Sequence, residues 1–178
     1  MEYHLFGLLL IALNGMEITG GTLENGFRIY RLENCMANLS VLFTNVSFEL
    51  KNQSYTIRFD IDVLEDDIED VDFHLSIDRC LNRAAPDTCE EYHEFDFPGF
   101  CSILHLHGPW SPIMDNMEPP YPCPPKKGKY IMKRSIIIKI EDLEKLRLER
   151  GYYFITKLKQ SEMKTHKLLF CGLIEGQF

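Results

Sequence analysis

The nine residues 55–63, YTIRFDIDV, decide the fold class of this chain. Large apolar side chains stand at every second position, and Thr, Arg and Asp fill the positions between them. Successive side chains of a β-strand point to opposite faces of the sheet, so this alternation predicts a strand with one apolar and one polar face.

The same alternation recurs in residues 71–77, after the acidic run 65–70. We therefore expect 55–63 and 71–77 to form one hairpin with a charged tip, with the carboxylates on its outer face.

Similar strand patterns lie on both sides of this pair. Apolar alternation predicts further strands around 27–29, 41–43, 48–50, 130–140, 152–158 and 167–174. A helical turn is expected only over 141–150, where Gly151 ends it. Many short strands separated by turns indicate an all-β, antiparallel β-sandwich of the immunoglobulin-like kind.

The first residues are typical of a secretory signal. Residues 5–13 form an uncharged apolar run that suits the core of a signal peptide and is too short to span a bilayer. We assign 1–20 to the signal peptide, with cleavage after Gly15 or around Gly20 and Gly21, and 21–178 to a single domain. A buried first strand or helix is the alternative.

Cysteines and sequons agree with export. Six cysteines form an even set, so three disulfides are expected in an oxidising compartment, although spacing alone selects none of the 15 pairings. Asn38, Asn45 and Asn52 each begin an Asn-x-Ser sequon and are candidate N-glycosylation sites. A net charge of -8 argues against a nucleic-acid partner, which requires clustered Lys and Arg.

Residues 103–121 differ from the rest of the chain. The prolines in this stretch are unsuited to the interior of a sheet, yet it carries Trp110, Met114 and Met117. An apolar loop of this length either folds onto the core or covers a binding site.

No motif indicates catalysis, a cofactor or a metal. His105 and His107 have a spacing seen in some zinc sites, but a third ligand is not apparent. The acidic run 65–70 lacks the spacing and the glycine of a calcium loop. The chain has no Gly-x-Ser-x-Gly elbow, and its cysteines are expected to be oxidised. We therefore expect a protein that is not an enzyme.

The order of the cysteines resembles that of one known group of proteins. Cys35 follows an aromatic-rich first strand, Cys80 and Cys89 bracket eight residues, and Cys101 precedes CPPKKGKY at 123–130; RGYYFITKL at 150–158 and Cys171 complete the series. This series resembles the ganglioside activator group of the MD-2-related lipid-recognition (ML) superfamily, and also the insect chemosensory B proteins. The resemblance covers residues 26–176 and is most specific at Cys-Pro-x-x-x-Gly-x-Tyr.

The resemblance implies a pairing and a function. Its disulfides would be Cys35–Cys171, Cys80–Cys89 and Cys101–Cys123. Its fold would be a β-sandwich whose sheets are splayed around a lipid cavity. The protein would then be a secreted, non-enzymatic binder and carrier of a lipid or another hydrophobic small molecule, with the lysosomal lumen as the alternative location. Transient membrane contact and an enzyme or receptor partner are compatible with this resemblance.

The alternation within the predicted strands identifies candidate cavity-lining residues. Each of them is equally compatible with a place in an ordinary packed core. The expected cavity-lining residues are Ile57, Phe59, Ile61, Val71, Phe73, Leu75, Ile136, Ile138, Tyr153 and Ile155. Trp110, Met114 and Met117 are expected at the mouth of the cavity.

Two features depart from the resemblance. The activator has a fourth disulfide in the loop that ends before the Cys-Pro motif, and this chain lacks both of its cysteines. Residues 141–150 carry four acidic and three basic side chains where the activator loop is apolar. This charge argues against extraction of lipid from membranes and favours a smaller, soluble hydrophobic ligand. The alternative function is an extracellular interaction module with a filled core that recognises a protein or receptor.

Overall fold

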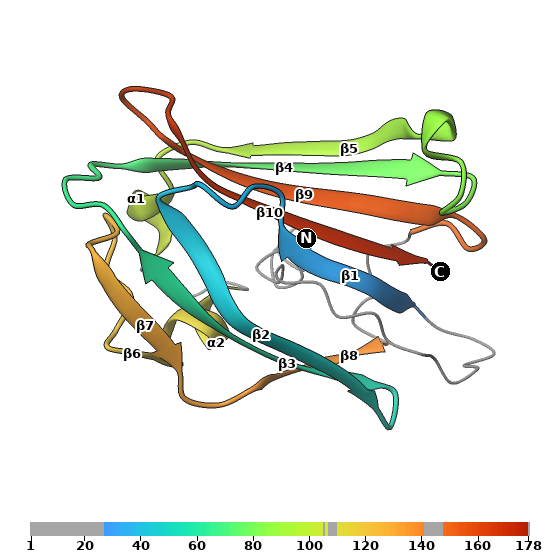
Figure 1. Cartoon of the computed structure of the whole chain (residues 1–178), viewed down its shortest axis with the longest axis horizontal. Helices are drawn as coiled ribbons and strands as arrows, with labels where there is room; N and C mark the ends of the chain where they lie inside the picture. Colours follow the sequence, from blue (N-terminus) through green and yellow to red (C-terminus); the bar gives the residue numbers. More distant parts are fainter. Residues whose placement is uncertain (1–26, 105, 107–109, 141–147, 178) are drawn as a thin grey trace.

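The computed structural model describes residues 27–104, 106, 110–140 and 148–177, and the protein is an antiparallel β-sandwich (Figure 1). Residues 1–20, His105, His107 and most of 141–150 therefore lie outside the described residues. In the first sheet the strand order is β1 (Arg28–Asn34), β10 (Leu168–Gln177), β9 (Tyr153–Glu162), β4 (Val71–Cys80) and β5 (Glu90–Phe97). In the second sheet it is β2 (Val41–Lys51), β3 (Ser54–Val63), β7 (Gly128–Met132) and β6 (Met117–Glu118), and β8 (Ile136–Lys139) also pairs with β3.

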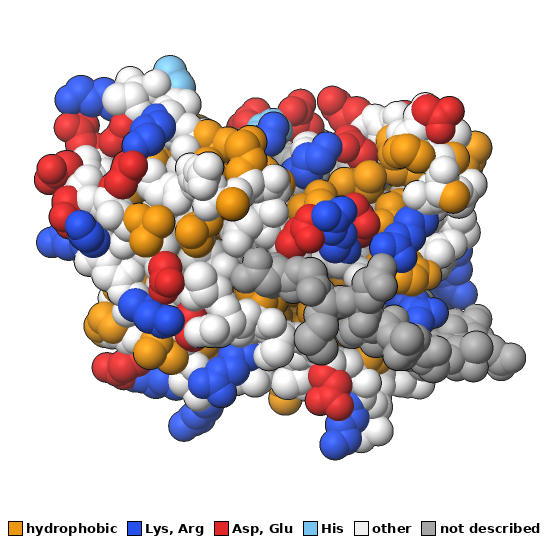
Figure 2. Space-filling model, in the orientation of Figure 1, with side chains coloured by type: hydrophobic (Ala, Val, Ile, Leu, Met, Phe, Trp, Pro, Cys, Tyr) orange, Lys and Arg blue, Asp and Glu red, His pale blue; other side chains and the backbone are white. Residues whose placement is uncertain are grey.

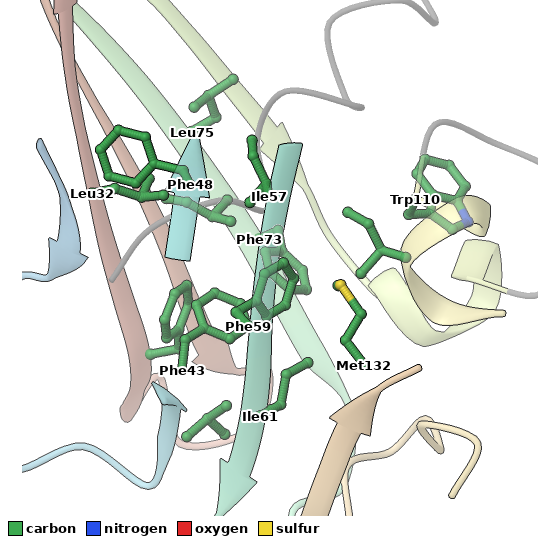
Figure 3. Packing of buried hydrophobic residues seen from close by; sticks show 14 of the residues in the cluster. Leu32, Phe43, Phe48, Ile57, Phe59, Ile61, Phe73, Leu75, Trp110 and Met132 are labelled. Atoms are coloured by element: carbon green, nitrogen blue, oxygen red, sulfur yellow. The ribbon is translucent and has the colours of Figure 1, made fainter. Parts of the chain in front are cut away.

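The predicted strand at 55–63 is confirmed and forms the centre of the second sheet. Its alternating apolar side chains, Tyr55, Ile57, Phe59, Ile61 and Val63, are all buried. Figure 3 shows how the aromatic side chains gather between the sheets. The ring of Phe43 lies 4.5 Å from that of Phe170 in β10 and 4.7 Å from that of Phe59, measured between centroids.

The predicted hairpin between 55–63 and 71–77 is wrong. β3 pairs with β2, β7 and β8, whereas β4 lies in the other sheet and pairs with β5 and β9. Both strands have one apolar face, and these faces cover the core from opposite sides. Residues 64–70 cross between the sheets, and lysine side chains pair with their carboxylates: Lys127 with Asp66, Lys164 with Glu69 and Lys167 with Glu65.

Asp60 is a buried carboxylate on the polar face of β3. A register shift in β2 at residues 44–47, where Asn45 has a φ of 53°, brings the Asn45 amide within 2.8 Å of Asp60 Oδ2. The Met132 N–H donates to Asp60 Oδ1 at 3.3 Å. These donors compensate for its removal from water.

Several other elements differ from the sequence prediction. The strand expected over 130–140 is two short strands, β7 and β8, which both pair with β3. The acid-rich edge strand β5 was not predicted, and neither were the short helices α1 (Phe100–Leu104) and α2 (Ser111–Met114) and the 3-10 turn η2 (Pro86–Thr88). No helix among the described residues is long and apolar enough to cross a membrane.

Three disulfides fix the sandwich, with the pairing that the resemblance implies. Cys35–Cys171 joins the end of β1 to β10, and Cys80–Cys89 closes the connection between β4 and β5. Cys101–Cys123 joins α1 to the segment before β7. Disulfides of this number are typical of proteins from an oxidising compartment.

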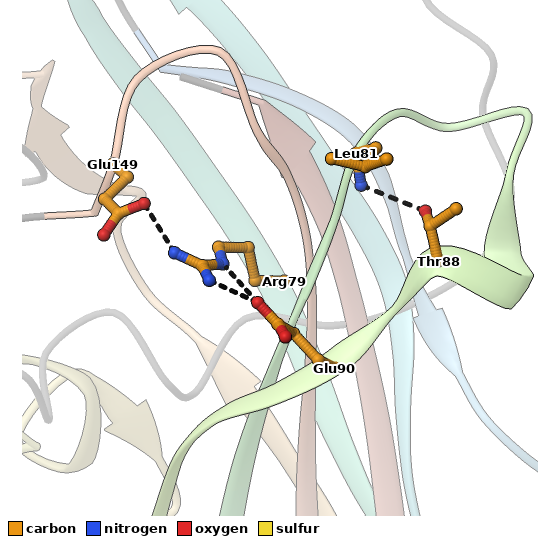
Figure 4. A network of polar contacts seen from close by, with 5 residues as sticks. All are labelled: Arg79, Leu81, Thr88, Glu90 and Glu149. Atoms are coloured by element: carbon orange, nitrogen blue, oxygen red, sulfur yellow. Dashed lines mark hydrogen bonds and ion pairs between the residues drawn. The ribbon is translucent and has the colours of Figure 1, made fainter.

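Arg79 ties the segment before β9 to the edge of the first sheet (Figure 4). Its guanidinium pairs with Glu90 of β5 and, at 2.5 Å, with Glu149. It also lies over the rings of Tyr92 and Tyr152, at 5.1 Å and 4.7 Å. Elsewhere on the face drawn in Figure 2, Lys and Arg are interspersed with Asp and Glu, as on an ordinary solvated surface.

Candidate ligand-binding site

The candidate site lies where α1 and α2 adjoin the core of the sandwich. Two carboxylates of the adjoining β4 region position α1: Asp72 Oδ1 accepts the Gly99 N–H at 2.8 Å, and Asp70 Oδ1 accepts the Cys101 N–H at 3.3 Å. Gly99 has a φ of +58°, a left-handed conformation that glycine adopts without strain, and this turns the chain from β5 into α1.

Trp110, the residue directly before α2, contacts the end of α1. Its indole N–H donates to the carbonyl oxygens of Leu104 and Leu106, at 3.0 Å and 3.1 Å. Its ring contacts Phe100, which in turn packs against Phe73 of β4. Trp110 is buried, so it supports the site from within.

A small hollow extends from α1 into the core. Its volume is about 20 Å³, which is room for about one water molecule. It is lined by Val41, Phe43, Ile61, Val71, Phe73, Phe100, Leu104, Met114, Tyr121, Cys123, Gln160 and Phe170. The described residues of this inner hollow include no charged side chain, and its polar side chains are Tyr121 and Gln160.

A larger depression opens to solvent beside the inner hollow. Its volume is about 470 Å³, within the range of small-molecule sites. The residues that line it are Cys101, Leu104, Met114, Asp115, Met117, Pro120, Tyr121, Cys123 and Lys133. Among the described residues, Leu104, Met114, Tyr121 and Cys123 line both spaces and therefore form a shared wall between the outer depression and the inner hollow.

Tyr121 is held at this boundary by CPPKKGKY. The Tyr130 ring packs against it edge-on at 5.0 Å, and the Tyr130 hydroxyl donates to the Lys126 carbonyl at 2.7 Å. Tyr121 lines the inner hollow together with Gln160, and the removal of its phenol from water raises its pKa above the ordinary value. Tyr121 is therefore a neutral hydrogen-bonding group inside an apolar wall.

Most of the predicted cavity residues lie either at the inner hollow or in the core. Ile61, Val71 and Phe73 line the inner hollow. Ile57, Phe59, Leu75 and Ile138 are buried in the core cluster, and Ile136 is half-buried against it. Of the predicted mouth residues, Met114 and Met117 line the outer depression, while Trp110 is buried and lines neither space.

The prediction of Tyr153 and Ile155 as cavity residues is wrong. β9 pairs Leu158 with Leu75 and Gln160 with Phe73, so its even-numbered residues face the core. Tyr153 lies on the opposite face, with its hydroxyl 2.5 Å from Glu175 Oε2. Four apolar residues in succession, 152–155, allow either phase of the alternation, and the packing of Phe154 and Leu158 decides it.

Gln160, Tyr121, Leu104 and Phe100 were missed as site residues. Gln160 could have been found from the sequence, because it continues the inward-facing series of Phe154 and Leu158 with a polar side chain. In the structure this side chain is only 3% exposed. Tyr121 had none, since it lies in a proline-rich segment without periodicity.

The structure also bears on the metal and glycosylation sites that the sequence suggested. Among the described residues, no group of His, Cys, Asp or Glu is arranged to hold a metal ion. Asn38, Asn45 and Asn52 are exposed, and Asn52 occupies the two-residue turn between β2 and β3.

No protein-family model and no curated protein matches the chain.

Proposed function

We propose that the protein is a secreted, non-enzymatic binding protein that carries a lipid or another hydrophobic small molecule. The observation that supports this best is the open depression, which shares Leu104, Met114 and Tyr121 as wall residues with a small, largely apolar hollow. A ligand in the depression would contact apolar walls, with a few polar groups to orient it.

The energetics favour a ligand with an alkyl chain. Each methylene group that leaves water for an apolar site gains about 0.8 kcal/mol. Met114 and Met117 are suited to such a ligand, because thioether side chains adapt their shape to irregular apolar partners. The resemblance to lipid-recognition proteins supports the same class of ligand.

Secretion is supported by several features. The three disulfides fit an oxidising compartment, and the exposed sequons are accessible to glycosylation. The apolar run 5–13 supplies the expected export signal, and the lysosomal lumen is the alternative destination. The charged segment 141–150 favours a soluble ligand over one taken from a membrane.

One observation favours a second function, an extracellular interaction module that recognises a protein or receptor. Aromatic rings from both sheets meet at 4.5–4.7 Å around Phe43, so this part of the interior is filled. A filled interior requires that recognition take place on the outer surface.

The experiment that separates these functions is titration of the secreted protein with N-phenylnaphthylamine, whose fluorescence rises in apolar surroundings. We expect saturable binding that Met114→Lys weakens about tenfold or more, because it places a cation on the apolar wall of the site. Met163→Lys is the matched control, since Met163 is 48% exposed in the turn after β9.

The outcomes are distinct. Saturable binding that Met114→Lys alone weakens supports a carrier that uses this site. Absence of saturable binding by protein with intact disulfides would contradict the carrier function and favour the interaction module.

A further inference from the structure

The inner hollow combines an apolar lining with two polar side chains. Gln160 comes from the inward face of β9 and Tyr121 from the segment before β7, and both side chains line this same small hollow. Polar groups inside an apolar site fix the orientation of a ligand more than they add to its affinity. This pair therefore bears on the chemical class of the ligand.

The size of the hollow limits what can enter it. A volume of about 20 Å³ holds one water-sized group. A hydroxyl or carbonyl oxygen has this size, whereas the body of a ligand requires the 470 Å³ of the outer depression. A phenol can donate and accept, and a primary amide donates two hydrogen bonds and accepts others, so both side chains can serve one ligand oxygen.

The charges of the site disfavour an anionic ligand. The described residues that line the inner hollow include no cation to compensate a carboxylate or phosphate, and burial of an unpaired charge is costly. In the outer depression Lys133 is already paired with Glu118, and Asp115 lines the same wall. An acidic headgroup would therefore meet as much negative as positive charge.

We propose that the ligand is an uncharged amphiphile, an alkyl chain that ends in one hydroxyl or carbonyl group, whose oxygen is held by Tyr121 and Gln160. The chain occupies the outer depression against Met114 and Met117, and the oxygen lies in the inner hollow, across the wall that the two spaces share. This inference rests on the proposed function as a carrier and assigns its ligand class.

The test is displacement of N-phenylnaphthylamine by three compounds of equal chain length: dodecan-1-ol, dodecanoate and dodecane. At pH 8 we expect dodecan-1-ol to displace the probe at concentrations about tenfold lower than either competitor. Relative to dodecane, the alcohol gains one buried hydrogen bond. Relative to dodecanoate, it avoids the cost of removing a charge from water.

Two variants test the role of the polar pair. Tyr121→Phe and Gln160→Leu should each remove most of the preference for dodecan-1-ol over dodecane while both compounds still bind. Tyr30→Phe is the matched control, because its hydroxyl contacts Gln177 Oε1 at 3.1 Å and does not line the site. Circular dichroism establishes that each variant is folded.

Wild-type protein supplies a measurement that needs no variant. Dodecanoate should bind more tightly as the pH falls toward the pKa of a carboxyl group, about 4–5, because the neutral acid can occupy the hollow. The affinity for dodecan-1-ol should change less over the same range.

Two results would overturn the ligand class while leaving a carrier function intact. One is displacement by dodecanoate at pH 8 as effective as by dodecan-1-ol, and the other is an unchanged alcohol preference in both variants. If no compound displaces the probe, or the probe does not bind, the carrier function itself fails and the ligand class with it.

Discussion

Tyr55 connects the two sheets through a single side chain. Its hydroxyl accepts the Ile29 N–H at 2.9 Å and donates to the Phe27 carbonyl at 3.1 Å, and the residue is only 2% exposed. Burial raises the pKa of this phenol. The side chain thereby satisfies backbone groups at the start of β1 that belong to the opposite sheet.

Tyr55→Phe should lower the free energy of unfolding by roughly 1–3 kcal/mol, because it leaves two buried backbone groups without this partner. Urea denaturation monitored by circular dichroism measures the change. Tyr30→Phe is the control, with an expected change of about 0.5 kcal/mol or less for its part-buried hydrogen bond. Equal stability of Tyr55→Phe and wild type would show that the hydroxyl does not join the sheets.

At the scale of elements, α1 is short and depends on neighbours for its position. The carboxylates of Asp70 and Asp72 accept N–H groups at its start, and the Cys101–Cys123 disulfide fixes its first turn. Because Leu104 at its end separates the inner hollow from the outer depression, the position of α1 bears directly on the site.

Asp72→Ala should lower the stability by about 1–2 kcal/mol, since the Gly99 N–H loses a charged acceptor. Amide exchange at 100–104 should accelerate, and the affinity for the apolar probe should fall. Asp66→Ala is the control, because Asp66 is exposed and lies 4.0 Å from its lysine partner. Unchanged exchange at 100–104 in Asp72→Ala would contradict this account of α1.

Much of the fold was predictable from particular residues. The period-two pattern of 55–63 established a strand and its buried face, because one side of the sheet is solvated there. It did not establish the partner strand, because β3 and β4 are equally amphipathic and only packing decides that they cover the core from opposite sides. β5 was missed because it is an edge strand with mostly exposed acidic residues.

The site was less predictable than the fold. Met114 and Met117 could be nominated because large apolar side chains in a proline-rich segment need a partner surface. The placement of Tyr121 and Gln160 at one hollow depends on the course of the chain between α2 and β7, which has no periodic signal. Sequence alternation therefore predicted the walls of the site better than its polar centre.

For the whole molecule, the sandwich buries several tyrosine hydroxyls away from water. Burial raises the pKa of Tyr55, Tyr121, Tyr130 and Tyr153, and for Tyr153 the carboxylate of Glu175 adds to this effect. Each phenol therefore binds its proton more tightly in the folded than in the unfolded state. The resulting stability is fully present below the unfolded pKa, about 10, and is lost as the pH rises above it.

The free energy of unfolding should accordingly fall between about pH 10 and 12, by up to about 1.4 kcal/mol per pH unit for each such phenol. Urea unfolding over this range, with the disulfides intact, measures the slope. Tyr121→Phe should reduce the slope, because it removes one of the shifted groups. A stability that does not change up to pH 12 would contradict the prediction.

The central claim is that the molecule carries a hydrophobic ligand, and native mass spectrometry of protein secreted from a eukaryotic host tests it most directly. We predict a complex with an added small-molecule mass, lost in Met114→Lys, on a protein whose three disulfides are intact. Ligand-free protein with the same disulfides, which also fails to take up the apolar probe, would contradict the claim.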